Sequence, residues 1–169
     1  KLAPEALCEV LFQTPTDSRV TVAAFSDFYC PYCKVLTARL AARDDIAVTW
    51  HELPLLGPAS DVAARAAVAA ARQGGYVALQ TRLTATQFRP TRRFLADMAD
   101  ALGLSAKQLL VDMDSEDVAQ TLARSRRASR TLGIWGTPAV AVGSTLVIGA
   151  IDDAALSALI AEEAARGGC

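Results

Sequence analysis

The chain has 169 residues, a formal net charge of −1, and a composition that is 52% hydrophobic and 21% charged. A chain this apolar and this weakly charged is neither intrinsically disordered nor covered by the broad basic surface that binds nucleic acid. No stretch approaches the ~20 consecutive apolar residues of a membrane-spanning helix. The length is that of one ordinary domain, so we expect residues 1–169 to form a single domain whose partners are proteins or small molecules.

The first strands of the expected sheet come from the N-terminal third of the chain. The segment RVTVAAF (19–25) has the alternating and then continuous apolar pattern of a largely buried strand. The next segment, CPYCKVLTARLAAR (30–43), has helical apolar spacing, and IAVTWHEL (46–53) has the pattern of a second strand. A strand, a short helix and a strand in this order favour a right-handed unit with parallel strands, which indicates the α/β class.

The middle of the chain is expected to form an inserted helical segment over about residues 59–133. Five stretches with helical spacing follow one another there, and glycine, proline or serine separates them. The chain then returns to two strands, PAVAVG (138–143) and TLVIGA (145–150), joined by a tight turn, before a closing helix at 152–166. Both ends of the chain should therefore contribute to one sheet.

Two of the four cysteines, Cys30 and Cys33, are spaced as a reactive pair. Cys30 stands where the first strand gives way to a helix, and the N–H groups and dipole at a helix N-terminus stabilise a thiolate. Pro31 suits the first helical turn, and the two-residue gap lets Cys33 attack a mixed disulfide formed at Cys30. A zinc or copper site and an inert buried pair are the alternatives, although no second C-x2-C motif or histidine pair completes a four-ligand set.

Three segments together resemble the DsbA-like thiol:disulfide oxidoreductases of the thioredoxin superfamily. They are the Cys30-Pro31-Tyr32-Cys33 motif after a strand, the segment GIWGTPAVAVG (133–143) that opens the hairpin, and HELPLLGPASDVAARAA (51–67) after the second strand. The resemblance covers nearly the whole chain. It implies a thioredoxin fold with an inserted helical segment.

The resemblance also implies a binding site for an extended polypeptide beside the cysteine pair. In the family, the proline of the second motif is cis and packs against the cysteines, a position held here by Pro138. The backbone of the preceding residue, here Thr137, binds the client segment, so affinity comes mostly from main-chain contacts. Tyr32 and Trp135 flank the two motifs and are expected to contribute an apolar rim for unfolded polypeptide.

The resemblance supports a dithiol oxidase that introduces disulfides into exported proteins. It implies a periplasmic location after signal removal, reduced or unfolded exported polypeptides as clients, a DsbB-like or DsbD-like membrane redox partner, and no cofactor. An envelope disulfide reductase or isomerase, and a copper- or zinc-binding chaperone that uses the same sulfurs, are the alternatives. Because Tyr32 cannot ionise as a histidine does, we hypothesise a potential less oxidising than the ~−120 mV of the strongest family oxidant.

The sequence departs from the family at the position where many relatives carry a proton acceptor. Many relatives carry a buried carboxylate six residues before the first cysteine, where this chain has Ala24. Asp27 is expected nearer the surface and, with Pro31, is only a possible modulator of the cysteines. Glu52 could replace the missing acid if it were buried near Cys33, but an exposed carboxylate is the expectation.

The remaining polar features have ordinary structural interpretations. Cys8 and Cys169 could form a structural disulfide between the chain ends, or could be idle thiols. His51 is expected to be a packed or hydrogen-bonded strand residue. The basic run RSRRASR (124–130) is expected to line the solvated side of a helix.

Overall fold

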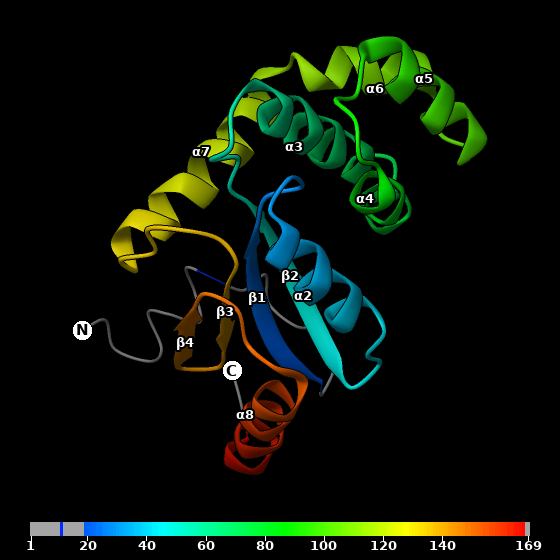
Figure 1. Ribbon diagram of the computed structural model, residues 1–169. Coiled ribbons are helices and arrows are strands. Elements are labelled where there is room, and N and C mark those ends of the chain that lie inside the picture. Colours follow the sequence, from blue (N-terminus) through cyan, green and yellow to red (C-terminus); the bar gives the residue numbers. More distant parts are fainter. Residues whose placement is uncertain (1–10, 12–18, 168–169) are drawn as a thin grey trace.

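The computed structural model describes residue 11 and residues 19–167, and its centre is a four-stranded mixed sheet (Figure 1). The strands lie in the order β2-β1-β3-β4. Their bounds are Val20–Ser26 for β1, Ile46–Glu52 for β2, Ala139–Val142 for β3 and Thr145–Ile148 for β4. β2 runs parallel to β1, whereas β3 is antiparallel to both β1 and β4. The predicted α/β class and the joining of both chain ends in one sheet are confirmed.

Helices cover both faces of this sheet. On one face, α2 (Pro31–Ala41) and α8 (Asp153–Arg166) pack through apolar side chains against the even-numbered residues of β1. Successive strand residues point to opposite faces. Ala23 and Phe25 therefore pack on the other face, together with Ala128 from the long helix α7. Burial on both faces explains why β1 is apolar along almost its whole length.

Five helices lie between β2 and β3, as the periodicity predicted. Their bounds are Pro58–Ala71 for α3, Tyr76–Ala85 for α4, Arg92–Ala101 for α5, Ala106–Met113 for α6 and Glu116–Thr131 for α7. α3, α4, α5 and α6 gather at the end of the sheet where β1 finishes and α2 begins, whereas α7 runs back along the sheet and packs on one of its faces (Figure 1). α3 contributes a row of fully buried alanines, whose small side chains allow the neighbouring helices to approach closely.

Side-chain hydrogen bonds fix where several of these helices begin. Thr91, Ser105 and Ser115 each accept a bond from the backbone N–H three residues later, at the starts of α5, α6 and α7. Asp152 does the same for α8. Such caps satisfy N–H groups that have no partner within the helix, and each stabilises its helix by about 1 kcal/mol.

The C-terminal hairpin turns through Gly143 and Ser144, as predicted. Gly143 has a φ of +53°, and a side-chain carbon at this position would overlap the carboxyl group of Glu163 on α8. Glycine is therefore required both by the backbone conformation and by the space.

The surface of α7 carries the basic run found in the sequence. Arg124, Arg127 and Arg130 are exposed on this helix, which confirms the predicted solvated side. Within the part of the chain that the structure describes, no helix is both long enough and apolar enough to cross a membrane.

Candidate active site

Cys30 and Cys33 lie at the start of α2, at the end of the sheet that faces the inserted helices. Cys30 is the N-cap residue, with extended backbone angles, and Pro31 is the first helical residue. Both cysteines are free thiols and both are buried, with 6% of Cys30 and 1% of Cys33 exposed. The predicted placement at the junction of strand and helix is confirmed. An incoming sulfur therefore meets Cys30 before Cys33.

A second segment, remote in sequence, meets the pair at Cys30. The peptide bond between Thr137 and Pro138 is cis. Cys30 Sγ lies 3.5 Å from the carbonyl oxygen of Thr137. The strand register explains this meeting, because Ala139 pairs with Phe25 and so the residues before β3 run beside those after β1. The two sequence motifs thus form one site.

Cys33 is held in its thiol form by its surroundings. Burial raises its pKa from 9.0 to about 12. The backbone N–H of Asp27 donates to Cys33 Sγ at 3.5 Å and, like the Thr137 side chain, opposes this rise, whereas Cys30 adds to it. At neutral pH a Cys33 thiolate is therefore strongly disfavoured, and a Cys33 sulfur that leaves a disulfide needs a proton.

The prediction that Asp27 lies nearer the surface is wrong, since only 1% of this residue is exposed. Its carboxylate accepts four hydrogen bonds, at distances of 2.8–3.0 Å, from the N–H groups of Tyr29, Leu55 and Leu56 and the hydroxyl of Ser60. Asp27 thereby joins the segment before Cys30 to the loop after β2 and to α3. Its amide, and not its carboxylate, is the group that contacts Cys33.

The prediction that Glu52 is exposed is also wrong. Only 3% of Glu52 is exposed, and its carboxyl group is hydrogen-bonded to the phenol of Tyr76, which in turn accepts a bond from Gln80 at 3.0 Å. Burial raises the pKa of Glu52 from 4.5 to about 8, the hydrogen bond from Tyr76 opposes the rise, and the charge of Asp27 adds to it. The sequence signal for this group was the pair Tyr76 and Gln80, which stand one turn apart on the face of α4 that also carries the buried Leu79 and Leu83.

His51 occupies the other face of the sheet. Its ring stacks on Phe25 with centroids 4.5 Å apart. Its Nε2 lies 3.0 Å from the carbonyl oxygen of Leu11, and its Nδ1 lies 3.4 Å from the hydroxyl of Ser125. Burial lowers the pKa of His51 below its ordinary value. The prediction of a packed, hydrogen-bonded strand residue is confirmed.

Two features of the surface surround the cysteines. Tyr32 is 65% exposed and Trp135 is 83% exposed, as expected of rim residues, whereas Phe28 belongs to the core. Beside Tyr32 lies an open groove of about 400 Å³ between α2 and the segment before α8. The residues that line the groove are Tyr32, Val35, Leu36, Arg39, Ala150, Ile151 and Asp152.

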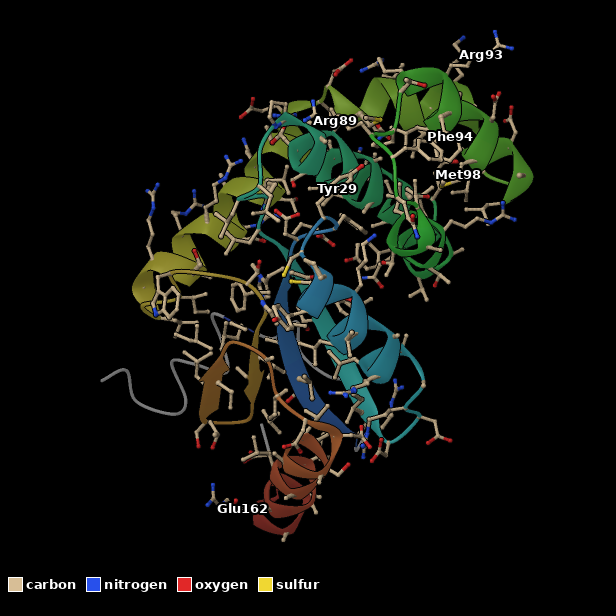
Figure 2. The ribbon with its side chains drawn as sticks, in the orientation of Figure 1. Tyr29, Arg89, Arg93, Phe94, Met98 and Glu162 are labelled. Carbon is tan, nitrogen blue, oxygen red and sulfur yellow. The ribbon has the colours of Figure 1, made fainter. Side chains whose placement is uncertain are left out.

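On the opposite side, the site is linked to the inserted helices. In Figure 2, Tyr29 lies between the start of α2 and this helical layer. Its hydroxyl donates to the carbonyl oxygen of Phe88 at 3.0 Å, and Lys34 donates to that of Thr86 at 2.9 Å. Both bonds fix the segment between α4 and α5 against the start of α2.

Comparison with known proteins identifies the family. Residues 21–161 match the DSBA-like thioredoxin domain. The chain belongs to this family. A thioredoxin-like oxidoreductase from Silicibacter pomeroyi DSS-3 is 32% identical to this DSBA-like chain, with a TM-score of 0.77 over 89% of the chain and 88% of that protein. A periplasmic thioredoxin-like protein from Salmonella enterica serovar Typhimurium is 27% identical, with a TM-score of 0.82 over 98% and 99%.

A relative among the curated proteins is much longer than this DSBA-like chain. The Na(+)/H(+) antiporter NhaA of Herminiimonas arsenicoxydans is 30% identical over 159 residues, which are 91% of this chain but 25% of the antiporter. The chain therefore spans about a quarter of that relative. Together the comparisons confirm the thioredoxin fold with its inserted helices and the membership of the chain in the DSBA-like family.

The predicted disulfide between Cys8 and Cys169 lies outside the residues that the structure describes. Among residues 11 and 19–167, no group of three or more histidine, cysteine or acidic side chains is placed to hold a metal ion.

Proposed function

We propose that this DSBA-like chain is a dithiol oxidase that introduces disulfides into exported polypeptides. The observation that carries the proposal is the unequal burial of the pair. Cys30 stands at the helix N-terminus beside Thr137, whereas Cys33 lies behind it with its thiolate destabilised. Cys30, at the N-terminus of α2, is the sulfur that a client reaches first, and Cys33 is the sulfur that leaves and takes up a proton when a client reduces the pair.

The reaction consists of two thiol–disulfide exchanges. A client thiolate attacks Cys30 Sγ of the oxidised pair, the Cys30–Cys33 bond breaks, and Cys33 leaves with the electron pair and takes up a proton. A second client thiolate then attacks the client sulfur of the mixed disulfide. This step releases Cys30 as a thiolate and the client with a new disulfide. The enzyme has gained two electrons, which an oxidising partner must remove before the next cycle.

The client is proposed to bind as an extended strand. The backbone of Thr137 offers main-chain hydrogen bonds beside Cys30, and Pro138 supports the pair from the same loop. The apolar groove next to Tyr32 can accept a client side chain, since its wall formed by Val35 and Ile151 is largely hydrocarbon. Loose specificity follows, because main-chain contacts are common to all extended polypeptides.

A periplasmic location and a membrane redox partner complete the proposal. The Salmonella relative is described as periplasmic. Similarity to part of an antiporter supports action close to a membrane. A DsbB-like partner would reoxidise the pair, whereas a DsbD-like partner would reduce it and make the chain a reductase or isomerase.

The reduction potential of the Cys30–Cys33 couple separates these directions. It should be measured against glutathione in a chain with Cys8→Ser and Cys169→Ser, so that one pair reports. A potential between about −120 and −200 mV supports the oxidase, whereas one near about −270 mV, the range of thioredoxin, contradicts it and supports a reductase.

Single cysteine variants test the two roles. Cys33→Ser should accumulate mixed disulfides with client polypeptides that contain a disulfide: the Cys30 thiolate attacks the client disulfide, one client sulfur leaves as a thiolate, and no Cys33 thiolate is present to release the client from Cys30. The mixed disulfides should be visible on non-reducing gels. Cys30→Ser should form none and should oxidise no client. Full dithiol oxidation by Cys30→Ser would overturn the assignment.

A further inference from the structure

The buried acid Glu52 has no part in the reaction as described so far, although that reaction lacks a proton donor. When a client attacks Cys30, Cys33 departs as a thiolate into a site that raises its pKa to about 12. Ala24, which packs on the α2 face of β1, is a residue that cannot exchange a proton. The proton must come from another side chain or from bulk water.

The strand register places Glu52 on the face of the sheet where Cys33 lies. In the parallel pairing of β1 and β2, Trp50 is opposite Ala24 and Glu52 is opposite Ser26. Ala24 and Trp50 pack in the cluster that includes the side chains of α2, so Ser26 and Glu52, two residues further on, face α2 as well. The pair Ser26 and Glu52 lies next to the first turn of α2, because the N–H of Asp27, the residue after Ser26, contacts Cys33 Sγ.

The groups around Glu52 leave it able to gain and lose a proton near neutral pH. From α4, Tyr76 is a neutral phenol whose pKa burial raises well above 10, and Gln80 orients it. From the turn after β1, the charge of Asp27 disfavours the Glu52 carboxylate. At the start of α2, the titratable groups are the two cysteines, the exposed Tyr32, and Lys34, whose Nζ donates to the carbonyl oxygen of Thr86 at 2.9 Å. None of the ion pairs among the described residues includes Glu52.

We propose that Glu52 exchanges a proton with Cys33, and that Tyr76 and Gln80 hold its carboxyl group in position for this transfer. The proposal rests on thiol–disulfide exchange at Cys30, the reaction of the proposed function. On reduction of the pair, the client thiolate and Cys30 form a bond, the bond from Cys30 to Cys33 breaks, Cys33 receives the proton, and Glu52 becomes a carboxylate. On oxidation, the carboxylate takes the proton back as Cys33 attacks.

The transfer predicts a pH profile that a purely structural role would not produce. The test is the rate at which reduced glutathione opens the oxidised Cys30–Cys33 bond, in the chain with Cys8→Ser and Cys169→Ser. Each second-order rate constant is divided by the thiolate fraction of glutathione at that pH. In the wild type this corrected rate should be level in acid and should fall as the pH passes about 8, where Glu52 loses its proton.

The Glu52→Gln variant has no carboxyl proton to transfer, but its amide keeps the size and the zero charge of the protonated glutamic acid. Its corrected rate should be at least about tenfold below the wild type at pH 6, since general acids typically contribute 10² to 10⁴ in rate. Its rate should be nearly independent of pH, so that the two proteins agree within about twofold where Glu52 is ionised. The matched control is Glu163→Gln, a second buried glutamate on α8, which should behave as the wild type.

A second variant keeps the test decisive if Glu52→Gln folds poorly. Tyr76→Phe retains the carboxyl group but loses a hydrogen bond that lowers its pKa, so the inflection should move to higher pH. A wild-type profile without an inflection, a Glu52→Gln defect of equal size at every pH, or an unmoved inflection in Tyr76→Phe would each overturn the proposal. Glutathione exchange occurs in an oxidase and in a reductase alike. An oxidised wild type that glutathione does not open at Cys30 would instead overturn the proposed function, and this proposal with it.

Discussion

Replacing Glu52 with glutamine should remove a large pH-dependent loss of stability. The pKa of Glu52 rises from 4.5 to about 8 on folding. Its contribution to stability is therefore fully present below about pH 4.5 and is lost as the pH rises to about 8, because the folded protein binds the proton more tightly than the unfolded chain does. One pKa step corresponds to about 1.4 kcal/mol. The ionised form should destabilise the folded protein by an amount on the order of 5 kcal/mol.

Glutamine is neutral at every pH and can still accept the hydrogen bond from Tyr76. The free energy of unfolding of Glu52→Gln should therefore match that of the wild type within about 1 kcal/mol at pH 4, and should exceed it by several kcal/mol at pH 9. The assay is urea unfolding of both proteins across this range under reducing conditions, with Glu163→Gln as the matched control. Only the difference at each pH is interpreted, so titrations shared by both proteins cancel. A difference that stays constant between pH 4 and pH 9 would refute the reasoning.

Three further changes have effects that follow from single contacts. Asp27→Asn replaces an acceptor of four hydrogen bonds by an amide that must turn an N–H₂ group toward N–H donors, and should lower the free energy of unfolding by about 3 kcal/mol in urea titrations. Tyr32→Ala removes an exposed side chain, so stability should change by less than about 0.5 kcal/mol while the Michaelis constant for a reduced polypeptide rises; unchanged kinetics would exclude Tyr32 from the client site. Gly143→Ala should lower the thermal midpoint more than Gly74→Ala, because both glycines have positive φ but only the first faces Glu163, and equal midpoints would contradict the described packing.

The sequence predicted those parts of the site that depend on local pattern. Cys30 was placed at a helix N-terminus because a change from strand to helical spacing is visible within a few residues. The nearness of Thr137 to Cys30, by contrast, joins positions 107 residues apart, and only the family resemblance indicated it. Periodicity within a segment carries no information about contacts at this separation.

The two wrong predictions, for Asp27 and Glu52, share one physical cause. Both carboxyl groups are buried by partners that come later in the chain. Asp27 is covered by residues 28, 29 and 33 positions ahead, and Glu52 by Tyr76, which is 24 positions ahead. Charged residues are rarely buried, so exposure is the correct expectation until such partners are known. The burial of an acid among polar partners depends on tertiary structure and cannot be read from a local pattern. Buried acids are most frequent at functional sites.

The four bonds accepted by Asp27 limit how this redox centre can be transplanted. The segment of residues 27–33 carries the reactive sulfurs, but its shape depends on donors that belong to residues 55–60. A protein engineer who moved only residues 27–33 onto another thioredoxin scaffold would leave the Asp27 carboxylate with the N–H of Tyr29 and without its other three donors. The two segments therefore depend on each other. A substitution in either should be tolerated only when the donors of residues 55–60 and the carboxylate of Asp27 can still form their hydrogen bonds.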